Sequence, residues 1–233
     1  MRPEGWFWAH DIAPAQLDSV LMPGTRLVRL SRYGPRFAAL VYTQAGADRG
    51  YALDLDAGAL ASRLRETGVR PVAITVSDDG EDARYSVVFE TGPGPAASVH
   101  LDLAAAELAE LSDDQHAIAD LATYRAGGRR LFAAVRRPRT GPSWLFTGLE
   151  ERGLTARLRQ HDLAPVRLRA YREDGRPVLA AVAEPAGDRR RAWYTDLDGD
   201  AVARKLERNA AYPTDLDATR GEDGVRFTVT MTR

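Results

Sequence analysis

The sequence has no cysteine, a single lysine and no long apolar run, and each absence narrows what the chain can be. Without cysteine there is no disulfide, no thiolate metal site and no cysteine nucleophile. Lys205 is the only lysine among 32 basic residues, so arginine carries almost all the positive charge. No stretch approaches the 18 consecutive apolar residues of a membrane-spanning helix.

The charges are balanced, which argues against strongly charged partners. The chain of 233 residues has a formal net charge of −1. This balance predicts neither nucleic-acid binding nor attraction to an anionic membrane. The first residues lack the apolar core and cleavage site of a signal peptide. We therefore predict a cytoplasmic protein, with secretion left open if a signal sequence was removed.

One short apolar pattern returns five times along the chain. It reads RFAALVY at 36–42, RYSVVFE at 84–90, LFAAVRR at 131–137, VLAAVAE at 178–184 and RFTVTMT at 226–232. A fixed period of this kind indicates tandem repeats, here with a mean spacing of about 46 residues. The repeats occupy approximately residues 6–50, 51–98, 99–143, 144–191 and 192–233.

Each repeat begins with a large apolar residue followed three positions later by a polar one. The five pairs are Trp8–Asp11, Tyr51–Asp54, Val99–Asp102, Trp144–Thr147 and Trp193–Asp196. A leucine stripe after each pair predicts a short helix, and we expect the aspartates to be its N-caps. In the alternative, these carboxylates face one axis and bind a cation or cationic ligand.

Two strands follow the helix in each repeat. Arg29 and Arg167 alternate with apolar neighbours, which predicts a half-buried strand with the arginines outward. Turns rich in Gly and Asp follow at 34–36, 78–84, 125–130, 172–177 and 220–224. The recurring apolar pattern is the return strand, and it is apolar enough to be buried on both faces.

The repeats predict an α/β repeat protein of the α+β kind. Five βαββ units of about 46 residues form a single repeat domain over residues 1–233. One unit cannot bury its apolar face alone, so neighbouring units must stack. No polar cap sequence exists at either end, and we therefore expect a closed or nearly closed pseudo-symmetric ring, with an open arc as the alternative.

These units resemble the tandem repeat of polyglycine hydrolase-like proteins, a bacterial structural repeat. The shared features are the aromatic-x-x-Asp-Leu start, the leucine stripe, the Arg-Phe-Ala-Ala-like return strand and a strand-ending tyrosine at Tyr33, Tyr124 and Tyr171. In that family the repeats often precede a serine hydrolase domain with Ser-x-x-Lys. Here Val202 stands three residues before Lys205, so the resemblance implies the repeat region without hydrolase activity. The five units are more weakly similar to the pentein ring, whose usual catalytic cysteine is absent here.

Equivalent aromatic and arginine positions supply the first candidate site residues. Trp8, Trp144 and Trp193 pack in the core or between units, or else stack on a ligand. The arginines that precede return strands, Arg36, Arg84 and Arg226, are solvated strand ends in the simplest interpretation. The alternative is a ring of guanidinium groups that binds phosphate or carboxylate.

Positions that break the repeat supply the remaining candidates. His100 is one of four histidines at non-equivalent positions, and two of them could meet in acid–base chemistry. No histidine spacing predicts a metal, and we predict no cofactor. Glu150 lies in the fourth repeat, where Thr147-Gly148 replaces Asp-Leu and the alignment predicts one inserted residue. A site could have developed there, or the helix start has drifted.

Two functional hypotheses remain open on the sequence. The first is a non-catalytic binding or interaction module with a protein, peptide or glycan ligand, because structural repeats fill the chain. The second is a small-molecule enzyme with an axial pocket of Arg, Asp and His side chains, for example in bacterial secondary metabolism. No catalytic residue can be assigned, and no nucleic-acid or membrane partner is expected.

Overall fold

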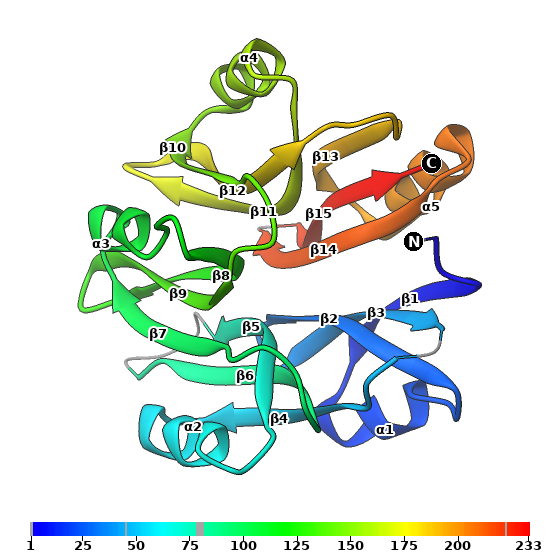
Figure 1. The fold of residues 1–233 in the computed structure, drawn as a ribbon. Helices are drawn as coiled ribbons and strands as arrows, with labels where there is room; N and C mark the ends of the chain where they lie inside the picture. Colours follow the sequence, from blue (N-terminus) through cyan, green and yellow to red (C-terminus); the bar gives the residue numbers. More distant parts are fainter. Residues whose placement is uncertain (1, 45, 78–81, 222) are drawn as a thin grey trace. The chain divides into compact units, whose positions relative to one another are not determined.

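The structure is a computed structural model that describes residues 2–44, 46–77, 82–221 and 223–233. The chain forms two compact parts, residues 1–138 and residues 139–233. The first part contains repeats one to three, coloured blue to green in Figure 1, and the second contains repeats four and five. Each part is described by itself. Much of the turn expected at 78–84, and residue 222 of the last turn, lie outside the described residues.

Every repeat has the predicted order of strand, helix, strand and strand. In repeat one these are β1 (Gly5–Ile12), a 3₁₀ turn η1 (Pro14–Gln16) with α1 (Leu17–Val20), β2 (Thr25–Tyr33) and β3 (Arg36–Thr43). Repeat two has β4 (Arg49–Leu55), α2 (Ala57–Leu64), β5 (Arg70–Ser77) and β6 (Arg84–Glu90). Repeat three has β7 (Ser98–Leu103), α3 (Ala105–Glu110), β8 (His116–Ala126) and β9 (Arg129–Pro138).

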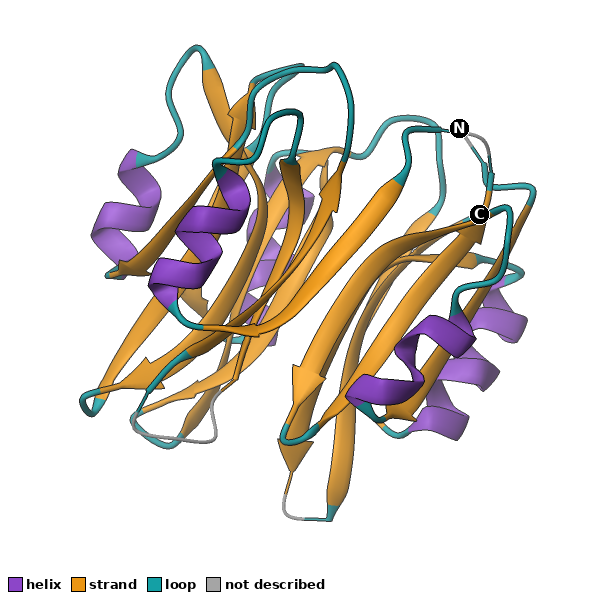
Figure 2. Ribbon diagram, turned by 90° about the horizontal axis from the view of Figure 1, so that it is seen from below, coloured by secondary structure: helices purple, strands orange, loops and turns teal. Residues whose placement is uncertain are grey.

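The second part repeats the same order twice. Repeat four has β10 (Trp144–Leu149), α4 (Glu151–Gln160), β11 (Leu163–Glu173) and β12 (Arg176–Pro185). Repeat five has β13 (Arg191–Leu197), α5 (Gly199–Asn209), β14 (Tyr212–Gly221) and β15 (Gly224–Thr232). In Figure 2 the helices lie against the sheets rather than within them.

Each repeat folds into its own three-stranded antiparallel sheet with the return strand in the middle. The strand orders are β1-β3-β2, β4-β6-β5, β7-β9-β8, β10-β12-β11 and β13-β15-β14. The prediction of a doubly buried return strand is confirmed, since Phe37 to Val41 of β3 are at most 1% exposed. The fold is therefore α+β with five repeated units, and none of the described sheets closes on itself.

The aspartates at the repeat starts are not helix N-caps, and that prediction was wrong. Asp11, Asp54, Asp102 and Asp196 have φ between 54° and 59°. Each lies in a bulge of the first strand, where the register shifts against the return strand. A bulge of this kind needs a left-handed residue, a conformation that aspartate tolerates better than most residues. The capping carboxylates belong instead to Asp56 and Asp198, which accept from the N–H groups of Ala59 and Ala201.

The bulge corrects the alignment of the fourth repeat. Gly148, with φ of 67°, takes the left-handed position there, not Thr147. Leu145 then occupies the position of Trp8, because both precede their bulge residue by three. Leu154 follows Gly148 by the same interval that separates Leu17 from Asp11. The fourth repeat therefore has no insertion in its helix start, and Trp144 is one residue out of register.

Neighbouring repeats complete one another's cores. Tyr51 and Leu53 of repeat two pack on the buried residues of repeat one. Val99 and Leu101 of repeat three pack on repeat two, and Trp193 of repeat five packs on repeat four. Within each part, the predicted stacking of apolar faces is confirmed.

Candidate functional site

Buried charges lie on the strands that follow the helices. Arg29 of β2 is 2% exposed, so its predicted outward position was wrong. Val28 is the extra residue of a bulge between Leu27 and Arg29. Leu30 packs in the core of repeat one and Arg29 lies on the opposite face of the sheet, as strand alternation requires, but this second face is buried as well. Arg29 forms an ion pair with Asp120 of β8, whose Oδ2 also accepts the N–H of Ile74 at 2.7 Å. These contacts bind β2, β5 and β8 of the first part together.

The second part has an equivalent buried pair. Oδ2 of Asp215 on β14 lies 2.6 Å from Nη1 of Arg169 on β11 and accepts the N–H of Leu168 at 3.1 Å. Nε of Arg169 also lies 3.8 Å from Asp217. Asp120 and Asp215 occupy the same position in their repeats and bind the same backbone N–H of the preceding repeat. Recurrence of one contact in two repeat pairs indicates a structural role.

A different cluster of charges occurs between repeats one and two. Arg26 of β2, Arg49 of β4 and Arg70 of β5 all contact the carboxylate of Glu90, the last residue of β6. Nε and Nη2 of Arg49 donate to Oε1 of Glu90 at 3.2 and 3.0 Å, and Nη2 of Arg70 reaches Oε2 at 3.5 Å. Nη2 of Arg26 also donates to Oε1. We call these four residues the arginine cluster.

The arginine cluster is largely buried yet reaches solvent. Its four side chains are between 11% and 19% exposed. Within the described part of the chain, Nε of Arg26 and Nη1 of Arg70 are buried and make no hydrogen bond. Burial acts to raise the pKa of Glu90, but the hydrogen bonds and charges of Arg49 and Arg26 outweigh it and hold this pKa below its ordinary value. Glu90 is therefore ionised near neutral pH.

The arginine cluster breaks the repeat pattern. Arg26 and Arg70 are equivalent, since each lies two residues before the extra residue of the bulge in its strand, Val28 and Val72. The other repeats have Ala117, Ala164 and Tyr212 at this position. The sequence signal was therefore an arginine present at this position in only two repeats. It did not point to a cluster because neither Arg49 nor Glu90 is close to both arginines in sequence.

The predicted aromatic residues do not converge on one site. Trp193 belongs to the core of repeat four, as its packing interpretation predicted. Trp8 stacks on His10 with ring centroids 5.4 Å apart. Trp144 is 38% exposed and does not occupy the equivalent position.

The predicted arginines lie at strand ends. Arg36 lies 3.5 Å from Asp11, and Arg226 lies 3.7 Å from Asp196. Arg84 is exposed at the first residue of β6. The two ion pairs join the start of a return strand to the left-handed aspartate of its own repeat, which favours the strand-end interpretation.

His100 belongs to a polar group in repeat three. Its Nε2 lies 2.9 Å from Oγ of Ser98, and burial together with the charge of Arg136 lowers its pKa. Nη2 of Arg136 lies 2.9 Å from Nδ1 of His116 and donates to Asp113 at 2.6 Å. Two of the four histidines thus share Arg136 as a neighbour. Among the described residues, no group of three potential ligands could hold a metal ion.

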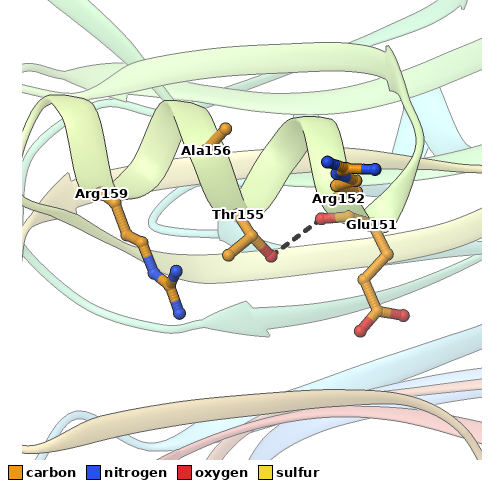
Figure 3. Close-up of a pocket in the computed structure, with 5 residues that line it drawn as sticks. All are labelled: Glu151, Arg152, Thr155, Ala156 and Arg159. Atoms are coloured by element: carbon orange, nitrogen blue, oxygen red, sulfur yellow. Dashed lines mark hydrogen bonds between the residues drawn. The ribbon is translucent and has the colours of Figure 1, made fainter.

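Glu150 precedes α4 as its N-cap residue, without a side-chain capping bond. Beside it, a shallow groove runs along α4, lined by Glu151, Arg152, Thr155, Ala156 and Arg159 (Figure 3). The hydroxyl of Thr155 donates to the backbone oxygen of Glu151, and Thr195 of β13 donates to its carboxylate at 3.2 Å. Glu150 does not line this groove, whose charged side chains are one glutamate and two arginines along a helix surface.

No protein-family model and no curated protein matches the chain. The similarity to the repeats of polyglycine hydrolase-like proteins therefore stays a prediction. Across the described residues, no helix is both long enough and apolar enough to span a membrane.

Proposed function

We propose that the chain is a tandem-repeat binding module and that the arginine cluster contacts an anionic group of its ligand. The supporting observation is that three guanidinium groups surround one carboxylate at a place where the repeat pattern is broken. Residues at repeated positions are accounted for by packing, bulges and recurring ion pairs. Among the described residues, this group of charges recurs in no other repeat and has no such explanation.

The chemistry of the cluster favours an anion over other ligands. Arginine stays protonated at all physiological pH values and presents a planar fork of donors that matches carboxylate or phosphate oxygens. Side chains that are largely buried but reach solvent form stronger charge-assisted bonds than fully exposed ones. A protein, peptide or small molecule could carry the anionic group.

Thermal unfolding with a panel of carboxylates and phosphates tests this function. We expect anions to raise the unfolding temperature of the wild-type chain, because a ligand that binds only the folded state stabilises it. Arg49→Gln and Arg70→Gln should lose most of this effect. Arg65→Gln is the matched control, since Arg65 is an exposed arginine of the same repeat with a bond to Ser62. An anion effect of equal size in all four proteins would refute the proposal.

The alternative function, a small-molecule enzyme, has the Ser98–His100 pair in its favour. A neutral imidazole 2.9 Å from a hydroxyl can act as a general base. Hydrolysis of an activated ester that is lost in His100→Ala would support this alternative. A rate unchanged in that variant would remove it.

We also propose that the five repeats close into a ring. We further propose that the protein is bacterial and cytoplasmic. Ring closure is supported by the packing of neighbouring repeats, because each unit covers an apolar face of the next and a ring leaves no such face exposed. Chemical cross-linking between the first and last repeats of the monomer tests it.

A further inference from the structure

We propose that the arginine cluster recognises a dianionic phosphoryl group, which takes the place of the Glu90 carboxylate. This inference rests on the proposed binding function and specifies its ligand. It follows from the charge, the donor count and the backbone around Arg26, Arg49 and Arg70.

The charge of the cluster matches two negative charges rather than one. Three guanidinium groups carry three positive charges, and ionised Glu90 offsets one of them. With Glu90 displaced towards solvent, all three positive charges face the ligand. A carboxylate would only repeat the charge that Glu90 already supplies, whereas a phosphate monoester carries close to two negative charges above its second pKa near 6.

The donors of the cluster also exceed what one carboxylate can accept. Each guanidinium has five N–H donors, and a carboxylate offers about four acceptor sites. Oε1 of Glu90 takes bonds from Arg26 and Arg49, while its Oε2 has one long contact of 3.5 Å with Arg70. A phosphoryl group brings three terminal oxygens in a tetrahedral arrangement. These oxygens could accept from three guanidinium groups that approach from three different strands.

Gly46 and Gly94 leave room for two of the arginines, and a backbone contact positions the third. A Cβ atom at Gly46 would lie 2.7 Å from Nη1 of Arg26, and one at Gly94 would overlap Nη1 of Arg70. Nη1 of Arg49 donates to the backbone oxygen of Leu27 at 2.9 Å. The guanidinium groups are therefore positioned before any ligand arrives, which lowers the entropy cost of binding.

Isothermal titration at pH 8 with four small probes tests the inference. Methyl phosphate is the dianion, dimethyl phosphate is its monoanionic counterpart, and acetate represents a carboxylate. A phosphoserine peptide, with the unphosphorylated peptide as its control, shows whether the group is presented by a protein segment. We expect methyl phosphate to bind at least about tenfold more tightly than dimethyl phosphate or acetate. A phosphoserine peptide that binds tenfold more tightly still would identify a protein ligand, and equal affinity would identify a small molecule.

Variants of the cluster should change the affinity for methyl phosphate in opposite directions, which variants of a purely structural network would not do. Glu90→Gln removes the competing charge and should tighten methyl phosphate binding about tenfold. Arg49→Gln and Arg70→Gln should weaken it roughly 10- to 100-fold. Gly94→Ala keeps every charge but displaces Arg70, and it should also weaken binding. Circular dichroism confirms that each variant is folded before titration.

Three results would overturn the inference. Weaker binding in Glu90→Gln would show that the glutamate holds the arginines for the ligand rather than competing with it. Equal, arginine-dependent affinity for all anions would retain the proposed binding function and remove the dianion specificity. Absence of any arginine-dependent anion binding would remove both.

Discussion

Replacement of Asp120 by alanine should be among the most destabilising single changes in residues 1–138. Its side chain is fully buried, forms an ion pair with Arg29 and accepts the N–H of Ile74 at 2.7 Å. Loss of one partner of a buried ion pair costs about 3–5 kcal/mol, because a charge then stays in a poorly solvated place. The substitution also leaves the buried backbone N–H of Ile74 without its acceptor, which costs free energy of a similar order. We expect a loss of about 4 kcal/mol in the free energy of unfolding.

A double-mutant cycle separates the energy of the ion pair from the effect of the volume that its two side chains fill. Arg29→Met with Asp120→Leu replaces both charges by apolar side chains of similar size. Such replacements are often neutral or stabilising relative to the intact pair. The double variant should therefore be more stable than Asp120→Leu alone, although it contains one more substitution. Asp114→Ala, at an exposed residue of the same repeat, should change stability by less than about 0.5 kcal/mol.

Urea unfolding followed by circular dichroism measures these differences. The free energy should be compared at equal slope, because a chain with two compact parts need not unfold in one step. The reasoning is refuted if Asp120→Ala loses less than about 1 kcal/mol. It is also refuted if the double variant loses the full sum of the single losses, since the two side chains would then not be coupled.

Three further predictions follow from the repeated contacts. Gly148→Val should lower stability by about 1–3 kcal/mol in urea unfolding, because a β-branched residue resists the left-handed conformation, whereas Gly148→Asp should be tolerated as aspartate is in four repeats. Burial, followed by the bond to Asp18, raises the pKa of Tyr51 to about 12, which absorbance titration at 295 nm can measure. An unfolded tyrosine titrates near 10, so the stability from neutral Tyr51 is complete below about pH 10 and is lost between about pH 10 and 12. Tyr51→Phe should remove this part of the alkaline loss in unfolding midpoints, and an unchanged pH profile would contradict it. Asp215→Ala should destabilise the second part about as much as Asp120→Ala does the first, and a loss below about 1 kcal/mol would show that the two contacts differ.

The sequence predicted the repeated unit because its period appears in residue types. Return strands have runs of consecutive apolar residues, such as Phe37 to Val41, and only a strand covered on both faces needs that pattern. The helices follow the repeat starts because the leucine stripe has helical spacing. These features depend on local order alone, so the order and type of the elements could be read before the structure was known.

The role of the aspartates could not be read in the same way. A left-handed aspartate in a bulge and an aspartate that caps a helix both precede a helix by a few residues. The repeats contain both kinds, since Asp54 lies in the bulge and Asp56 caps α2. In repeat four a glycine replaces the bulge residue, which only a backbone constraint explains. That substitution at Gly148 was the available signal, and it was interpreted as an insertion.

Burial of both sheet faces explains why Arg29 was wrongly placed in solvent. Arg29 and Leu30 do point to opposite faces, since Leu30 packs in the core of repeat one and Arg29 pairs with Asp120 on the other side. That other face is covered by strands of the neighbouring repeats, which the sequence of β2 does not record. Burial of Arg29 therefore depended on a contact that a single strand cannot predict.

The arginine cluster shows where function can be sought in a chain built from repeats. A contact that recurs in several repeats, such as the aspartate that accepts a backbone N–H at Asp120 and Asp215, is explained by the need to join neighbouring units. A costly arrangement that occurs once is not explained in this way. Three like charges held together in a partly buried place lower stability unless something offsets them. Glu90 offsets one of the three charges in the structure, and a dianionic ligand that takes its place would offset two. If Glu90→Gln destabilises the unliganded chain and methyl phosphate restores its stability, the same electrostatic requirement accounts for both the glutamate and the ligand.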